Sequence, residues 1–234
     1  MRNWKKAISL AQGFYTKILF SDDLLFPDCL ERMLDEFEKS TAFVACSPAI
    51  GKNINSARVR YRKAFIRGKT LISSKDYIKH ALLDYGGLVS PSAALFRTED
   101  LVRSFIEEVD YEPGESFSYY GAGPDLLLFL LTANRYPRVT WINRPLVFLR
   151  DHPLSATTAA RSTKTFDIKL GYAVAKIWFA RTESLNLYAD IIVMNNWFYL
   201  KRQALGLPRP RLTSFIFFPV INIYFFLFSL IRNM

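Results

Sequence analysis

Two adjacent carboxylates follow a short apolar run near the start of the chain. The run reads KILFSDDLLFPD over residues 17–28, and the carboxylates belong to Asp22 and Asp23. In α/β proteins, ligands bind beyond the carboxyl ends of strands. Mg²⁺ and Mn²⁺ prefer oxygen ligands and keep positions open for substrate phosphates. The pair therefore predicts a metal ion that neutralises a diphosphate, although the spacing equally allows a turn followed by a helix N-cap.

A further carboxylate, Asp125, follows the turn GAGP at residues 121–124 and begins a strongly apolar segment. An aspartate at this position caps a helix, and a carboxylate held beside a substrate hydroxyl acts as a general base. The sequence leaves both roles open, and Asp110 and Glu115 are nearby competitors for the second one.

Arg150 and His152 form the last candidate group, after an extended run at 145–149. A guanidinium and an imidazole close together suit the binding of a diphosphate or a metal ion. The alternative is structural, because a single histidine is more often part of the scaffold than of a site.

Strands and helices alternate around these residues. Helices are predicted over 3–11, 27–39 and 125–132, in a stretch that begins near Thr98, and as one or two helices within 163–200. Strands are predicted over 15–20, 41–46, 90–97, 138–142 and 145–149. Leu30, Met33, Leu34 and Phe37 recur at helical spacing and predict the buried face of the second helix. The order predicts an α/β fold with a mixed sheet flanked by helices.

Composition limits the classes of partner. The 234 residues are 50% hydrophobic and carry a net charge of +10, which fits a folded domain with an anionic partner. Residues 41–75 hold eight basic side chains and no acidic one, whereas 99–115 hold seven acids against Arg103. These segments could face each other, be solvated, or contact phosphates and anionic lipid. We do not expect nucleic acid as a partner, because no nucleic-acid motif is present. Cys29 and Cys46 are too few for a disulfide framework, which favours a reducing compartment.

The segment 212–231 has no charged residue. Twenty helical residues span about 30 Å, the thickness of a bilayer core, but Pro219 and Asn222 interrupt the segment. It could span a membrane, lie on one, or pack as a soluble hairpin. Basic residues precede it, which predicts a cytoplasmic protein at the inner face of a membrane. The expected units are a domain over 1–157, a helical extension over 158–206 and a hydrophobic tail over 207–234.

Three segments, taken in order, resemble glycosyltransferase family 2, the inverting enzymes with the A-type nucleotide-sugar fold. Residues 3–33 look like the helix, strand and metal motif of this family. Residues 87–101 look like its acceptor-side strand, and 121–157 like the segment that holds the catalytic base. The resemblance implies a partial A-type sheet and sugar transfer from a nucleotide-diphosphate sugar to a carbohydrate or lipid-linked hydroxyl acceptor.

The resemblance also implies residue roles. Asp22 matches the second carboxylate of the family's Asp-x-Asp metal motif, and Asp23 is the neighbouring acid, so that both would hold Mg²⁺ or Mn²⁺. Phe20 stands where the first aspartate of that motif would be. Asp125 matches the catalytic base, and it is expected to face Asp22 across one cleft.

Arg150 and His152 match the segment near the donor diphosphate. In the family, strand–helix repeats that bind the nucleotide precede the metal motif, whereas only 21 residues precede Asp22 here. A strand–helix–strand unit needs about 30 residues. We therefore expect weak activity of the chain alone. The alternative is a non-catalytic, membrane-associated binding or assembly subunit that keeps the acceptor side and works with a separate nucleotide-binding chain.

Overall fold

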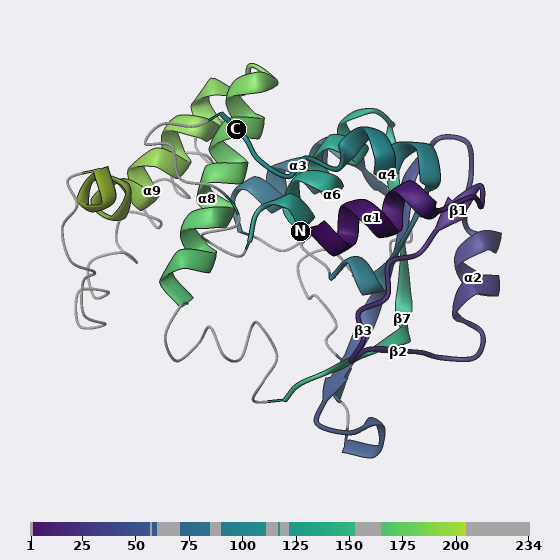
Figure 1. The fold of residues 1–234 in the computed structure, drawn as a ribbon. Coiled ribbons are helices and arrows are strands. Elements are labelled where there is room, and N and C mark those ends of the chain that lie inside the picture. Colours follow the sequence, from purple (N-terminus) through teal and green to yellow (C-terminus); the bar gives the residue numbers. More distant parts are fainter. Residues whose placement is uncertain are drawn as a thin grey trace, which may run out of the picture.

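A mixed β-sheet forms the centre of the computed structural model, which describes residues 2–56, 58–59, 71–84, 90–110, 117, 122–152 and 165–204 (Figure 1). Its strands are β1 (Tyr15–Thr16), β2 (Leu24–Leu25), β3 (Thr41–Gly51), β4 (Arg58–Val59), β5 (Leu71–Ser73), β6 (Ala94–Arg97) and β7 (Arg138–Arg150). The order is β1-β6-β3-β7-β2, with β4 paired to β3 and β5 paired to β7. Strands β3 and β7 are parallel and the other pairs are antiparallel, which confirms the predicted mixed α/β class.

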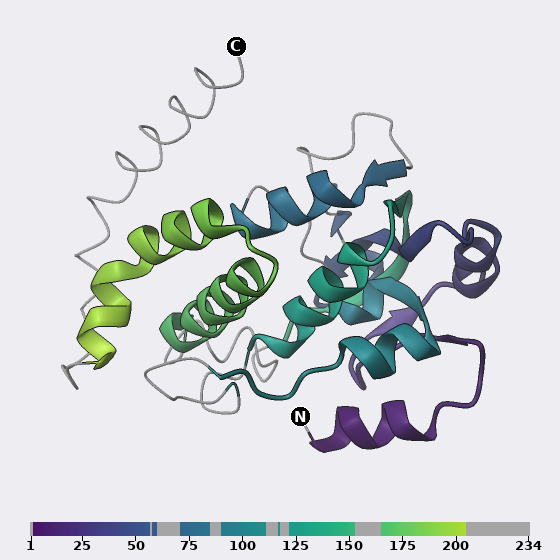
Figure 2. The same ribbon diagram turned by 90° about the horizontal axis from the view of Figure 1, so that it is seen from above.

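Helices cover the sheet on both faces and extend the molecule to one side (Figures 1 and 2). They are α1 (Arg2–Leu10), α2 (Cys29–Asp35), α3 (Ser74–Leu82), α4 (Thr98–Ser104), α6 (Pro124–Asn134), α8 (Thr165–Thr182) and α9 (Asn186–Ala204), with short 3-10 turns η1 (Ile54–Ser56) and η2 (Pro91–Ala93). The helices predicted near the N-terminus and after residue 124 are confirmed. The segment 163–200, predicted as one or two helices, forms two, α8 and α9.

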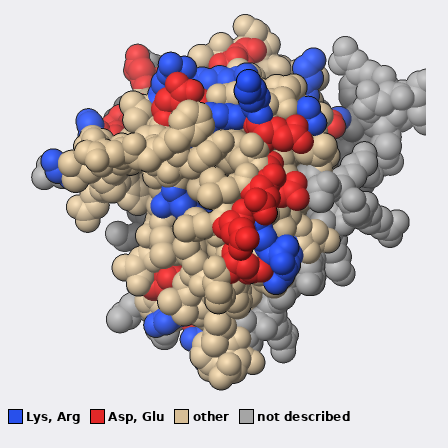
Figure 3. Space-filling view, turned by 90° about the vertical axis from the view of Figure 1, so that its right-hand side faces the viewer, with Lys and Arg blue, Asp and Glu red and all other residues tan. Residues whose placement is uncertain are grey.

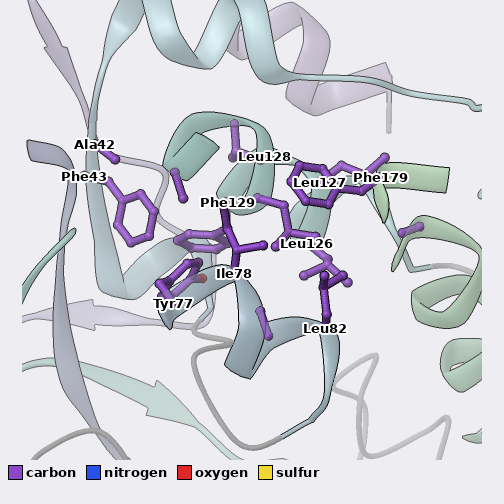
Figure 4. Packing of buried hydrophobic residues seen from close by; sticks show 14 of the residues in the cluster. Ala42, Phe43, Tyr77, Ile78, Leu82, Leu126, Leu127, Leu128, Phe129 and Phe179 are labelled. Atoms are coloured by element: carbon purple, nitrogen blue, oxygen red, sulfur yellow. The ribbon is translucent and has the colours of Figure 1, made fainter. Parts of the chain in front are cut away.

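Alternation along the central strands separates two apolar clusters. Phe43 and Ala45 of β3 belong to the larger cluster, whereas Val44 and Cys46 face the smaller one. This follows from the two-residue period of a strand. The larger cluster packs the sheet against α3, α6 and α8 (Figure 4). Buried Tyr77 of α3 contacts the ring of Phe43 of β3. The smaller cluster lies under α2.

The strand predicted over 15–20 is shorter than expected. Only Tyr15 and Thr16 pair with β6, because the chain then turns away and the Phe20 N–H donates to the Ser92 hydroxyl at 3.1 Å instead of to a strand. The two strands predicted over 138–142 and 145–149 are one strand, β7. Its register against β3 shifts between Cys46 and Ser47, and this irregularity accommodates Asn143 and Arg144.

The buried face predicted for the second helix is only partly correct. Met33 is buried and Phe37 is half-buried, but Leu30 is 47% exposed and Leu34 44% exposed. Helix α2 has seven residues and touches the sheet along the single stripe of Cys29 and Met33, so it has room to bury only that stripe.

One buried cation holds the loop before β3. Arg97, at the end of β6, donates to the carbonyl oxygens of Thr41 (2.7 Å), Glu38 (2.8 Å) and Lys39 (3.2 Å). Its guanidinium lies 4.6 Å from the ring centroid of Phe37 and 4.7 Å from that of Tyr136.

The tail at 207–234 lies outside the described residues, as does most of the basic segment between 57 and 70. Among the helices that the structure does describe, none is both long and apolar enough to cross a bilayer.

Candidate functional site

The paired carboxylates lie where β2 meets the end of β7. Leu24 and Leu25 pair with Phe148 and Val147, so the two aspartates that precede β2 lie beside the last residues of β7. Asp23 Oδ1 accepts a hydrogen bond from the Arg150 backbone N–H at 3.3 Å. Asp22 Oδ2 lies 3.0 Å from His152 Nε2. Residues separated by about 130 positions in the sequence are therefore neighbours in the fold.

The two aspartates differ in accessibility. Asp23 is 7% exposed. Burial raises its pKa, and hydrogen bonds from Ser92 and from the Arg150 backbone oppose that rise. Asp22 and His152, in contrast, have side chains about one-third exposed at 33% and 32%. Asp22 and His152 can thus meet a ligand, whereas Asp23 holds the end of β7 in place.

The difference in exposure between Asp22 and Asp23 affects which of the predicted metal ligands a metal ion could reach. The carboxylate of Asp23 is satisfied by internal donors, so that Asp22 and His152 are the accessible pair. Within the described part of the chain, no three His, Cys, Asp or Glu side chains lie close enough to hold a metal ion together. Mg²⁺ commonly takes only one or two protein carboxylates and completes its shell with water and substrate phosphates. The pair fits a metal ion only together with a diphosphate.

Ser92 is a site residue that the sequence analysis missed. Its hydroxyl is fully buried, accepts from the Phe20 N–H and hydrogen-bonds to Asp23. The N-terminal turn of η2 places it there, since Ser90 caps that turn and Pro91 starts it. A serine in an apolar strand pattern carries no sequence signal for this role.

Asp125 is held apart from this group, at the start of α6. Gly123 is the N-cap, with a φ of 130°, and Asp125 is the second residue of the helix rather than its cap. Its Oδ1 accepts from the Gly123 N–H at 3.3 Å, and its Oδ2 accepts from the Tyr172 hydroxyl of α8 at 2.8 Å. Burial raises the pKa of Asp125, and the hydrogen bond from Tyr172 is the largest opposing effect. The carboxyl group is thus a stronger base than an exposed aspartate.

The glycine before α6 is required by sterics as well as by its positive φ. A Cβ atom on Gly123 would lie 2.5 Å from the ring of Phe117. The turn therefore fixes where Asp125 begins the helix. Of the two competing acids, Asp110 is exposed and Glu115 lies outside the described residues.

The carboxylates of Asp22 and Asp125 have different partners, and no hydrogen bond or ion pair found among the described residues joins them. A cavity of about 250 Å³ lies elsewhere, between the start of α3 and the end of α6. It is lined by Ser73, Ser74, Lys75, Ile78, Ala133, Asn134, Tyr136 and Pro137. The structure thus brings four of the five predicted site residues together and keeps Asp125 in a second polar group.

No family model matches the chain, and no curated protein matches it.

Proposed function

We propose that the chain is a glycosyltransferase-type protein, with the partial A-type sheet and family 2 ancestry that its sequence resembles. It would transfer a sugar from a nucleotide-diphosphate sugar to a hydroxyl acceptor with inversion. The observation that carries the proposal is the meeting of Asp22 and His152, 3.0 Å apart, beside Arg150 at the end of β7. One accessible carboxylate, one imidazole and one exposed guanidinium suit a diphosphate with its cation.

In this proposal Asp22 and His152 would hold Mg²⁺ or Mn²⁺, and that ion would supply positive charge to balance the diphosphate. The exposed Arg150 side chain binds diphosphate oxygens, and Asp23 keeps the strand end in place from inside. Asp125 accepts the proton of the acceptor hydroxyl as its oxygen attacks the anomeric carbon. The raised pKa of Asp125 suits that role, because a stronger base takes a proton more readily.

Nucleotide binding gives the first test. Calorimetric titration with UDP and GDP, each with Mn²⁺, should give binding that His152→Ala weakens about tenfold or more, as expected for loss of a metal ligand or its partner. Asp190→Asn, an exposed aspartate on α9, is the control and should bind as the unaltered chain does. Absence of binding by the unaltered chain would contradict the donor site.

Sugar transfer gives the second test. Asp125→Asn keeps the shape of the side chain and removes the base, so turnover should fall about 10²–10⁴-fold. Nucleotide binding should stay unchanged, because Asp125 has no partner in common with Asp22. Undiminished turnover of Asp125→Asn would remove this residue from the mechanism.

The second candidate function is a non-catalytic, membrane-associated binding or assembly subunit. It is favoured by the observation that both oxygens of Asp125 already accept hydrogen bonds from the protein. Such a subunit would bind the carbohydrate or lipid-linked acceptor and leave the nucleotide to a separate chain. Acceptor binding without binding of UDP or GDP distinguishes it from the enzyme.

A further inference from the structure

The smaller apolar cluster contains three sulfur atoms, two from the inner face of α2 and one from β3. Cys29 and Met33 lie one turn apart on the helix, and Cys46 faces them from β3. Each of the three side chains is at most 1% exposed. The Sγ atom of Cys29 lies 3.9 Å from the Sδ atom of Met33. We call these three residues the sulfur cluster.

A lysine reaches into this cluster from the end of β1. The Nζ atom of Lys17 lies 3.5 Å from Met33 Sδ and donates to the Ala94 carbonyl oxygen at 3.2 Å. Burial lowers the pKa of Lys17, while the two thiol groups act on it in the opposite direction. No carboxylate within the described ranges pairs with Lys17. An ammonium group in an apolar cluster is costly unless an anion accompanies it.

We propose that the sulfur cluster binds one soft monovalent cation of the Cu⁺ type, with Cys29 and Cys46 as thiolates, Met33 as thioether and Lys17 as counter-charge. Thiolate and thioether ligands select Cu⁺ over harder ions. Two thiolates and one monovalent cation leave a charge of −1, which the Lys17 ammonium cancels. The proposal thereby accounts for both the sulfur atoms and the cation beside them, and it does not depend on sugar transfer.

The observed spacing fits a shared metal. Two sulfur ligands about 2.3 Å from one ion, the length of a typical metal–thiolate bond, lie about 4 Å apart when the ligand geometry is trigonal. Cys29 and Met33 are 3.9 Å apart without any ion. Cys46 belongs to the same buried apolar cluster as Cys29 and Met33.

Binding must release protons. Burial raises the pKa of Cys29 and that of Cys46, the latter to about 12, so both are thiols at neutral pH. The balanced step is two thiols plus one Cu⁺ giving two copper–thiolate bonds and two protons. The three side chains are buried, so an ion reaches them only when the packing around them opens. Glu31 and Asp35 on α2 are exposed, and acidic side chains are among those on this face (Figure 3).

The test is an anaerobic titration of the reduced full-length chain with Cu⁺ in competition with bicinchoninate. One ion should bind per chain, and the apparent affinity should rise about 100-fold per pH unit between pH 6 and 8, because two protons leave. Cys29→Ser or Cys46→Ser should weaken binding at least about 100-fold, and Met33→Leu about tenfold. The last change nearly conserves volume and removes only the thioether.

Met194→Leu on α9 is the matched control, because that methionine is 52% exposed and distant from the cluster in sequence. Lys17→Leu should weaken binding, since it removes the counter-charge without adding a sulfur atom. Three results would overturn the proposal. They are binding of two ions per chain, release of one proton or none, and equal Cu⁺ affinity of Met33→Leu and the unaltered chain. The number of ions bound and the pH dependence of the affinity are measured on the unaltered chain. The proposal can therefore be contradicted even if a variant fails to fold.

Discussion

At the scale of single residues, the Tyr172 hydroxyl adjusts the basicity of Asp125. It donates to Asp125 Oδ2 and so favours the ionised carboxylate against burial, which favours the neutral form. Tyr172→Phe should raise the pKa of Asp125 further. At pH 7 it should also lower the free energy of unfolding by about 1–2 kcal/mol, because the carboxylate loses a donor.

The pH dependence of that loss has a defined sign. Because the folded pKa of Asp125 lies above the unfolded value, ionisation of Asp125 destabilises the fold as pH rises through the folded pKa. The penalty of Tyr172→Phe should therefore shrink as pH falls and the carboxyl group becomes neutral. Urea unfolding at several pH values measures this change, with Tyr188→Phe on α9 as control. A penalty independent of pH would contradict the assignment.

Arg97 is the residue on which the loop before β3 depends. Its guanidinium satisfies three backbone carbonyl groups and stacks on two aromatic rings. A lysine cannot reproduce that planar set of donors. Arg97→Lys should lower the free energy of unfolding by about 2–4 kcal/mol.

Denaturant titration checks the Arg97 prediction, with Arg103→Lys as the matched control. Arg103 is 63% exposed and pairs with Glu99 at 3.5 Å, so its replacement should change stability by less than about 0.5 kcal/mol. Equal effects of the two substitutions would show that the carbonyl contacts of Arg97 contribute little.

Sequence patterns predict which side chains could take part in binding or catalysis, but they do not predict which other residues those side chains contact. Asp22, Asp23, Arg150 and His152 were predicted as site residues, and the pairing of β2 with β7 explains why they meet. Tyr172, Ser92 and Lys17 were not predicted, because their contacts join segments that are distant in sequence and differ in secondary structure. Periodicity and capping signals are local, whereas these contacts exist only after the sheet has formed.

At the scale of elements, one ion pair ties the end of α3 to α8. Lys176 of α8 is 4% exposed, and its Nζ atom lies 2.5 Å from Asp84 Oδ1, in a turn where Asp84 has a φ of 61°. Asp84→Asn tolerates that backbone and removes the charge. It should lower the free energy of unfolding by about 1–3 kcal/mol, because Lys176 would remain buried without its anion.

The double variant separates the ion pair from the packing. Lys176→Met should be close to neutral, and adding it to Asp84→Asn should restore most of the lost stability, because no buried charge then remains. Chemical unfolding of the four chains measures the coupling. Additive effects of the two substitutions would exclude the ion pair as the cause.

Some helices and strands were easier to predict from the sequence than others, depending on their length and on the residues that flank them. Helix α6 was predicted well, since a glycine turn, a proline and eleven apolar-rich residues all agree. The unbroken length of β7 was not predicted, because Asn143, Arg144 and Pro145 look like a turn in sequence. Tertiary pairing with β3 overrides that local signal. The exposure of Leu30 and Leu34 depends on how α2 is rotated about its axis against the sheet. The helical period of the sequence does not define that rotation.

At the scale of the whole molecule, basic residues outnumber acidic ones. The chain carries +10 in total, and the face seen from the α2 side carries basic and acidic side chains together (Figure 3). An anionic bilayer would attract the basic residues that precede the tail in the sequence, Lys201, Arg202, Arg209 and Arg211.

Vesicle flotation tests the proposed membrane contact. The full chain should float with anionic vesicles and remain bound at about 1 M salt, where the screening length is about 3 Å and purely electrostatic binding is lost. Phe217→Asp together with Phe226→Asp should make the binding salt-sensitive, because charge in an apolar segment opposes insertion. Recovery of the unaltered chain in the aqueous fraction would contradict the contact.

The parallel pairing of β3 with β7 also sets an order of events on the ribosome. Thr41 lies opposite Arg138 and Gly51 opposite Arg150, so β3 is synthesised nearly one hundred residues before the partner that it pairs with over most of its length. Until then β6 and β4 are the neighbours available to it, and one side of an apolar strand stays open. Such delayed pairing is slow and exposes the nascent chain to misassociation. A chaperone that holds the chain until residue 150 has emerged should raise the yield of folded protein.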